Sequence, residues 1–100
     1  MRVLERLIQQ VKPGQWQALE ALDQKFDVVE KQLGFPVKRR YRSFASSGNT
    51  DTLVIEREWE SLAVMEAAWE KLMTSAEYQK LDAEAQGILS SNAPEIFMVL

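Results

Sequence analysis

The segment over residues 59–69 constrains the fold of this chain more than any other, because it joins the end of a strand to the start of a helix within eleven residues. Trp59 ends a run of β-favouring residues. Ser61 follows where its hydroxyl can accept a hydrogen bond from a free amide of a new helix. The inner face of that helix then carries Leu62, Met65, Trp69 and Leu72. We therefore predict a strand that leads directly into an amphipathic helix.

Length and composition exclude several classes of protein. One hundred residues make one domain, residues 1–100. Twelve basic and 15 acidic residues give a net charge of -3, which offers no general attraction to nucleic acid or to an anionic membrane. Cysteine and histidine are both absent, which removes thiolate catalysis, the commonest general base and the commonest metal ligand. We expect no metal, no other cofactor, and no nucleic-acid or membrane partner.

The first residues of the chain do not have the pattern of a signal sequence. Charged residues interrupt residues 1–6 before an apolar run can reach the length of a signal sequence. No later run approaches the length of a membrane span. We therefore expect a soluble, cytoplasmic protein.

Residues 2–11 present the hardest choice between helix and strand. Their apolar residues, which are Val3, Leu4, Leu7, Ile8 and Val11, fit a helical stripe. A second helical pattern follows over residues 14–33 and is ended by Gly34. Two abutting helices would leave few strands to pair, so the periodicity of the first segment conflicts with the topology that the rest of the chain needs.

The remainder of the chain predicts a hairpin, two short helices and a final strand. Residues 37–45 and 52–59 read as paired strands around a turn at residues 46–49. The helix after Ser61 is interrupted at Thr74, and Ser75 is a second candidate cap. A further helical stretch carries Tyr78, Leu81, Ala85 and Ile88 on one face. Residues 90–94 then read as a loop before a last strand over residues 95–100.

With a strand at residues 2–11, the order becomes βαββαβ, a ferredoxin-like α+β arrangement with helices on one face of an antiparallel sheet. Two short motifs fall at characteristic places in that order, Lys12-Pro13-Gly14 and Trp59-Glu60-Ser61-Leu62-Ala63. Together with the intervening hairpin, they make the chain resemble the NIPSNAP-like and antibiotic-biosynthesis-monooxygenase-like members of the dimeric α+β barrel superfamily. The resemblance implies that residues 2–11 form a strand and that two such subunits form a dimeric barrel.

The last strand gives an independent reason to expect a homodimer. In this fold it lies at a sheet edge, yet its residues are apolar on both faces: Ile96, Phe97, Met98, Val99 and Leu100. A sheet edge exposed to water normally carries charge or proline. We expect a partner subunit to cover this edge, with coverage by the chain's own helical segment as the alternative.

The basic strand over residues 38–42 supplies the candidate ligand contacts. One face carries Lys38, Arg40 and Arg42, and the other carries Arg39 and Tyr41. Pairing about the hairpin turn would bring Lys38 to Glu58 and Arg40 to Glu56. One interpretation makes Arg40 and Arg42 donors to an anionic ligand. The other is a self-neutralised strand in water, where ion pairs contribute little.

Three functions remain open. The first is a homodimeric protein that binds a small, partly apolar molecule, which could be anionic, in the barrel or in a cleft between sheet and helices. Its candidate ligand-binding residues are Arg40, Tyr41, Arg42 and Trp59, whereas Trp16 and Trp69 fit buried helical stripes. The second is a cofactor-independent monooxygenase-like enzyme acting on aromatic substrates, in which the same cationic residues would stabilise a substrate anion. The third is a structural dimer without a ligand, its interior filled by Arg–Glu pairs.

Overall fold

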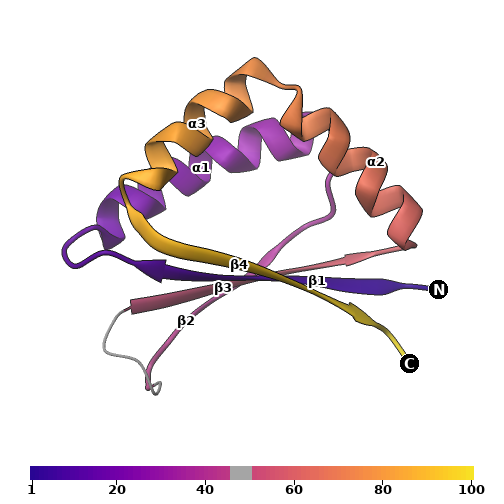
Figure 1. Ribbon diagram of the computed structural model, residues 1–100, viewed down its shortest axis with the longest axis horizontal. Coiled ribbons are helices and arrows are strands. Elements are labelled where there is room, and N and C mark those ends of the chain that lie inside the picture. The colour runs from indigo at the N-terminus through magenta and orange to yellow at the C-terminus, as the bar shows by residue number, and fades with distance from the viewer. Residues whose placement is uncertain (46–50) are drawn as a thin grey trace.

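A computed structural model of the chain describes residues 1–45 and 51–100, and it has the expected ferredoxin-like α+β fold (Figure 1). The elements in chain order are β1 (Val3–Val11), α1 (Trp16–Gln32), β2 (Arg39–Arg42), β3 (Asp51–Trp59), α2 (Leu62–Met73), α3 (Ala76–Gln86) and β4 (Leu89–Met98). The strands form one antiparallel sheet in the order β2-β3-β1-β4. The turn predicted at residues 46–49 lies outside the described residues.

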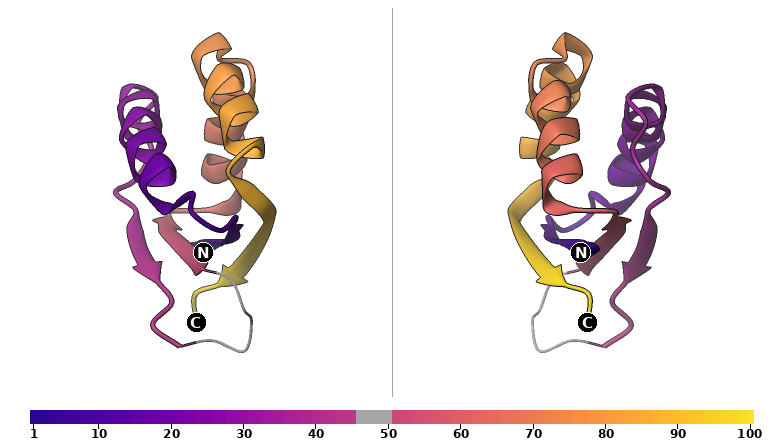
Figure 2. Two further views of the ribbon diagram at one scale, coloured as in Figure 1. Left: turned by 90° about the vertical axis from the view of Figure 1, so that its left-hand side faces the viewer. Right: turned by 90° about the vertical axis from the view of Figure 1, so that its right-hand side faces the viewer.

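The three helices lie on one face of the sheet, and the opposite face carries none of the described helices (Figures 1 and 2). Helix α1 stands on one side, and α2 with α3 stands on the other (Figure 2). The two chain ends meet at the same end of the sheet, where the Val99 amide donates to the Arg2 carbonyl over 3.0 Å. We call the uncovered face, which includes Leu4, Ile8, Val54 and Phe97, the helix-free face.

Residues 3–11 form a strand, as the resemblance implied and the helical periodicity did not. Alternate residues are buried against the helices, and they are Val3, Glu5, Leu7, Gln9 and Val11. Two of these five inward positions are polar, which hides the two-residue period of a half-buried strand. The helical stripe in the sequence arises because Leu4 and Ile8, on the helix-free face, are apolar as well.

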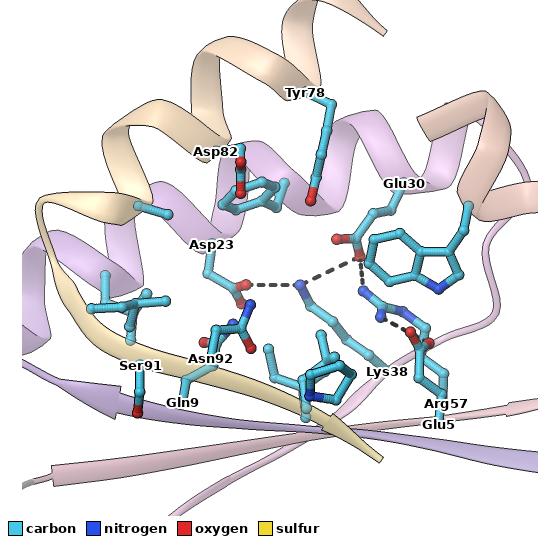
Figure 3. Close-up of a pocket in the computed structure, with 18 of the residues that line it drawn as sticks. Glu5, Gln9, Asp23, Glu30, Lys38, Arg57, Tyr78, Asp82, Ser91 and Asn92 are labelled. Atoms are coloured by element: carbon cyan, nitrogen blue, oxygen red, sulfur yellow. Dashed lines mark hydrogen bonds and ion pairs between the residues drawn. The ribbon is translucent and has the colours of Figure 1, made fainter. Parts of the chain in front are cut away.

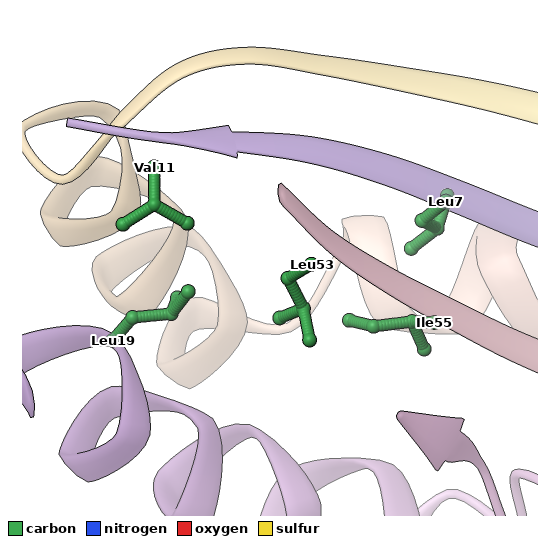
Figure 4. Close-up of a cluster of buried hydrophobic side chains, with 5 residues drawn as sticks. All are labelled: Leu7, Val11, Leu19, Leu53 and Ile55. Carbon is green, nitrogen blue, oxygen red and sulfur yellow. The ribbon is translucent and has the colours of Figure 1, made fainter. Parts of the chain in front are cut away.

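The core lies between the sheet and the helices. One cluster joins β1, β3 and α1 and consists of Leu7, Val11, Leu19, Leu53 and Ile55 (Figure 4). A second cluster joins the helices to one another through Leu22, Val29, Leu72, Leu81 and Ala85. Full burial of one such large aliphatic side chain contributes roughly 1.5–3 kcal/mol. These clusters therefore hold α1 and the α2–α3 pair on the same face of the sheet.

The predicted helix boundaries are confirmed by their capping contacts. The Ser61 hydroxyl accepts a hydrogen bond from the Val64 amide over 3.1 Å, and the Ser75 hydroxyl accepts one from the Tyr78 amide over 3.2 Å. The second cap starts α3 directly after α2 ends. Beyond α1, Gly34 adopts a φ of 78°, in the left-handed region that glycine enters without steric cost.

The predicted register of the hairpin is wrong by one residue. Arg39, not Arg40, lies opposite Glu56, and Arg40 lies opposite Ile55. The predicted pairs of Lys38 with Glu58 and of Arg40 with Glu56 are therefore not formed. A shift of one residue moves a side chain to the other face of a sheet, and Arg40 thereby faces α1.

The last strand begins at Leu89, so the loop predicted at residues 90–94 is wrong. Residues 91–94 pair with β1, and the register shifts between Gln10 and Val11, so that Ser90 has no partner in the ladder. Pro94 is tolerated because it has no backbone N–H to donate and β4 is an edge strand. The predicted edge position of this strand is confirmed. Its apolar residues at 96–100 are each at least 42 % exposed, so no helix among the described residues covers them.

Candidate functional site

A cavity of about 660 Å³ lies between the sheet, α1 and the α2–α3 pair (Figure 3). Its floor includes Glu5, Leu7, Gln9, Ile55, Arg57 and Asn92 from the strands. Its walls include Asp23, Phe26 and Glu30 of α1, Met65 and Trp69 of α2, and Tyr78, Asp82, Ala85 and Gln86 of α3. Apolar surface thus surrounds a limited number of charged and polar groups, as in many small-molecule sites.

Arg57 is the central charge on the cavity floor. Its side chain is 2 % exposed, and its terminal nitrogens donate to Glu5 Oε1 over 3.3 Å and to Glu30 Oε1 over 2.6 Å. Glu5 Oε1 also accepts the indole N–H of Trp59 over 3.0 Å. The guanidinium lies over the Phe35 ring, 5.3 Å from its centroid. Because a buried charge is tolerated only when it is paired, these contacts explain why Arg57 can occupy an inward position of β3.

Lys38 extends this charge network toward α1. Its ammonium lies 2.8 Å from Asp23 Oδ1, 2.9 Å from Asp27 Oδ1 and 3.4 Å from Glu30 Oε1. The Lys38 side chain is 7 % exposed, so these carboxylates replace most of its water. The Glu30 carboxylate therefore faces both Lys38 and Arg57, and it ties the two cations into one network (Figure 3).

Arg40 ends the network outside the cavity. It binds both carboxylate oxygens of Glu20, over 3.1 and 2.8 Å, and its Nε lies 2.8 Å from Asp23 Oδ2. The hydrogen bond from Arg40 lowers the pKa of the Glu20 carboxyl, and the same bond raises the pKa of the Arg40 guanidinium. Both shifts favour the charged forms, so this pair stays ionised at neutral pH.

The cavity lining carries more negative than positive charge. Its carboxylates are Glu5, Asp23, Glu30 and Asp82, and its cations are Lys38 and Arg57. Four negative and two positive groups leave a formal charge of -2. Both cations already face carboxylates, whereas Asp82 makes no hydrogen bond or ion pair to the part of the chain that the structure describes. The free charge that the cavity offers a ligand is therefore negative.

Tyr78 contributes a neutral hydroxyl beside Asp82. Burial raises the pKa of the Tyr78 phenol to about 12, with further contributions from the negative charges of Asp82 and Glu30. Its ring packs against Phe26 and Trp69, with centroids 5.8 and 6.4 Å away. Figure 3 shows the side chain reaching from α3 into the cavity. The hydroxyl stays protonated near neutral pH and can both donate and accept a hydrogen bond.

The four residues expected to bind a ligand do not come together, and none of them lines this cavity. Arg40 holds Asp23 and Glu20 from the edge of the network. Arg42 pairs with Asp51 over 2.9 Å and lies over the ring of Trp16, 4.0 Å from its centroid.

The other two candidates are separated by burial and by the sheet itself. Tyr41 is 47 % exposed and belongs to the helix-free face, where it lies opposite Val54. Trp59 is 3 % exposed and packs in the core against Phe35, with ring centroids 5.1 Å apart. Trp69 packs against the buried core clusters, as the helical stripe predicted, and it also lines the cavity.

The residues that sequence reasoning missed share one signal. Glu5, Asp23 and Glu30 carry charge at positions where the neighbouring apolar residues predict burial. A charge at such a position needs a buried partner of opposite sign. The partners of these three carboxylates are Arg57 and Lys38, which lie far away in the sequence. The signal therefore predicts a charged interior without identifying the pairs.

Two further features of the described residues concern metal binding and membrane spans. Over residues 1–45 and 51–100, no group of three or more acidic, histidine or cysteine side chains could hold a metal ion. Within the same ranges, every helix is too short or too polar to cross a membrane.

These features define a ferredoxin-like α+β domain with one uncovered sheet face and an acidic cavity beneath its helices. The fold is that of NIPSNAP-family and antibiotic-biosynthesis-monooxygenase-like proteins, so the expected resemblance is confirmed at the level of the fold. Neither a protein-family model nor a curated protein sequence matches the chain.

Three solved structures illustrate the likeness. A NIPSNAP family protein from Agrobacterium tumefaciens is similar with a TM-score of 0.78 and 15% identity, covering 100% of this chain and 94% of its own. An uncharacterised NIPSNAP-like domain protein from Burkholderia xenovorans gives 0.77 and 14%, covering 99% and 85%. A protein from Nitrosomonas europaea, proposed to be an antibiotic biosynthesis monooxygenase, gives 0.67 and 12%, covering 98% of each chain.

Proposed function

We propose that this chain is a homodimeric binding protein that holds a small, partly apolar molecule in the cavity between its sheet and its helices. The observation that carries the proposal is the cavity itself. Its volume of about 660 Å³ falls within the range of roughly 300–1,000 Å³ that is usual for small-molecule sites. Leu7, Ile55 and Trp69 offer apolar surface to the body of such a molecule, and the charge network offers fixed polar groups.

Two of the residues expected from the sequence enter this proposal as positioning residues. Arg40 holds the Asp23 carboxylate at the cavity wall, and the Trp59 indole N–H holds Glu5 on the floor. Arg42 and Tyr41 lie outside the cavity. An anionic ligand held by Arg40 and Arg42 was one of two interpretations of the sequence, but both guanidiniums are already paired or stacked, and the lining has a formal charge of -2.

Association through the helix-free face and the β4 edge completes the proposal. The apolar residues over 96–100 are exposed along an edge with free backbone groups, which a second subunit could pair and cover. A smaller hollow of about 320 Å³ lies on the helix-free face, between Leu4, Arg39 and Glu56, and would be enclosed by the partner. The cytoplasm remains the expected location of this dimer.

Two alternatives follow from particular observations. The fold shared with a protein proposed to be an antibiotic biosynthesis monooxygenase supports a cofactor-independent oxygenase acting on aromatic molecules. Such an enzyme must stabilise a substrate anion, and in this cavity Lys38 and Arg57 are already neutralised, so binding ranks first. The buried ion pairs support a structural dimer without a ligand, but pairs alone would not leave a cavity of this size.

The test of binding uses a neutral fluorescent probe, 1-pyrenemethanol, and two variants on the same helix. Ala85 lines the cavity, so Ala85→Phe should fill part of it and weaken binding at least tenfold. Ala83 is exposed and does not line the cavity, so Ala83→Phe should bind as the native protein does. Circular dichroism would show that both variants fold. Equal affinity in a folded Ala85→Phe variant would exclude the cavity as the binding site.

Native mass spectrometry of freshly purified protein tests the rest of the proposal. A dimer that carries additional mass would support both binding and association. Retained mass on a monomer would support the cavity and contradict the dimer. Oxygen consumption with an aromatic phenol, measured alongside, would favour the oxygenase if turnover exceeds that of Ala85→Phe.

A further inference from the structure

We propose that the cavity selects a ligand with a protonated amine and an apolar body, and that Asp82 and Tyr78 hold its ammonium group. This inference rests on the proposed function, because it assigns a ligand class to the same cavity. It differs from the anionic ligand that the basic strand at residues 38–42 left open as one interpretation.

The first step of the argument is the geometry of α3. Tyr78 and Asp82 are four residues apart, so they project from the same face of the helix. Both line the cavity, and Figure 3 shows both directed into it from above the sheet. The negative charge of Asp82 also contributes to the raised pKa of the Tyr78 phenol.

The second step is the availability of these groups. Over the described ranges, neither the Asp82 carboxylate nor the Tyr78 hydroxyl has a hydrogen-bond partner, whereas Lys38 and Arg57 each face at least two carboxylates. An ammonium group could donate to Asp82 and to the Tyr78 oxygen at once, and the phenol could still donate its own proton to a carboxylate. An anion would find the cations Lys38 and Arg57 already paired, and it would have to rely on neutral donors such as the Tyr78 hydroxyl.

The third step is the charge of the surroundings. The lining has four carboxylates and two cations, so an entering cation reduces the net charge and an entering anion increases it. Trp69 packs edge-on against Tyr78, with their ring planes at 84°, and supplies apolar surface directly beside the proposed ammonium site. The chemistry recognised is therefore a lipophilic amine.

The experiment compares three probes with the same ring system, 1-pyrenemethylamine, 1-pyrenemethanol and 1-pyrenecarboxylate, by fluorescence titration at neutral pH. We expect the amine to bind most tightly, at least tenfold more tightly than the carboxylate. Asp82→Asn keeps the shape and removes the charge, so it should weaken amine binding about tenfold or more and change alcohol binding less than twofold. Tyr78→Phe should weaken amine binding by a smaller factor.

The matched control is Glu84→Gln, which removes one negative charge from an exposed position of the same helix that does not line the cavity. It should leave amine binding unchanged. An equal loss in Asp82→Asn and Glu84→Gln would mean that only net charge matters, and it would overturn the assignment. Carboxylate binding as tight as amine binding would overturn it too. Failure of all three probes to bind would instead contradict the proposed function.

Discussion

Individual charged residues in this domain occupy positions that an apolar side chain would normally fill. Glu5, Arg57 and Glu30 are each less than a tenth exposed, and the terminal nitrogens of Arg57 donate hydrogen bonds to both carboxylates. Such a set adds little net stability compared with a well-packed apolar core. Each member nevertheless depends on the others, because a single removal leaves an uncompensated buried charge.

Replacement of Arg57 tests this dependence. Arg57→Met keeps much of the side-chain volume but leaves Glu5 and Glu30 without their shared cation, so we expect a loss of about 3–5 kcal/mol in the free energy of unfolding. Urea denaturation measures that loss. Arg2→Met, which breaks the exposed pair between Arg2 and Glu58, is the control and should leave the midpoint unchanged. An unchanged midpoint in Arg57→Met would mean that the buried carboxylates find other partners or protons.

The ionisation of Tyr78 gives a pH-dependent prediction. Its pKa is about 12 in the folded protein and about 10 in an unfolded chain, so the folded state holds the phenol proton more tightly. This contribution to stability is complete below pH 10 and is lost as the pH rises from about 10 to 12. Ultraviolet absorbance of the phenolate should show a step near pH 12 that is absent in Tyr78→Phe. A Tyr78-dependent absorbance step near pH 10 would contradict the buried environment of Tyr78.

At the scale of elements, the end of α1 depends on one backbone conformation. Gly34 has a φ of 78°, which a residue with a Cβ atom adopts only at a cost of roughly 1–2 kcal/mol. Gly34→Ala should therefore lower the free energy of unfolding by about that amount, measured by urea denaturation.

Gly87 provides the matched control at the end of α3. Its φ is -80°, and an added Cβ would meet only the Glu84 carbonyl oxygen at an ordinary distance of 3.5 Å. Gly87→Ala should be neutral or should stabilise the protein by up to about 1 kcal/mol. Equal losses in both variants would show that lost flexibility, and not the sign of φ, limits these positions.

The boundaries of the helices could be predicted because their signals are local. Ser61 and Ser75 cap α2 and α3 as the sequence indicates, and Gly34 ends α1. The strands were harder. Strand β1 was assigned only through a family resemblance, because paired charges allow Glu5 to replace an apolar inward residue. The first half of β4 was predicted to be a loop, because an edge strand tolerates polar residues and Pro94.

The candidate site depended on pairing information that a single sequence does not contain. Lys38 and Arg40 were correctly placed on one strand face, but a one-residue error in register gave them partners on β3 instead of α1. Tyr78 and Asp82 lie far from Arg57 in the sequence, and only the three-dimensional fold brings them into the same cavity. Local spacing therefore predicted which residues share a face, whereas the cavity depends on how distant faces meet.

The whole molecule has helices on one face of its sheet and an exposed apolar edge at β4. If a second copy covers this edge, a buried charge there should prevent association. We expect Phe97→Asp to yield a monomer or insoluble chain, measured by analytical ultracentrifugation, because the carboxylate would lose its water without gaining a partner.

The control for this prediction is Val64→Asp. Val64 is 45 % exposed and Phe97 is 42 % exposed, but Val64 lies on α2, on the helix-covered side of the sheet, whereas Phe97 lies on the helix-free face. This variant should keep the native mass in solution. A stable dimer in Phe97→Asp would exclude β4 from the interface, and a monomeric native protein would contradict the proposed dimer itself.

The alternation along β1 sets limits on how this protein can evolve. Its odd-numbered residues from Val3 to Val11 face the helices, and its even-numbered residues face the helix-free side. Under the proposed function, inward substitutions can therefore alter ligand preference without changing the proposed surface for association, and outward substitutions can do the reverse. Insertion or deletion of a single residue in β1 would exchange the two sets along part of the strand. We expect relatives to differ widely in the composition of this strand while keeping its length constant.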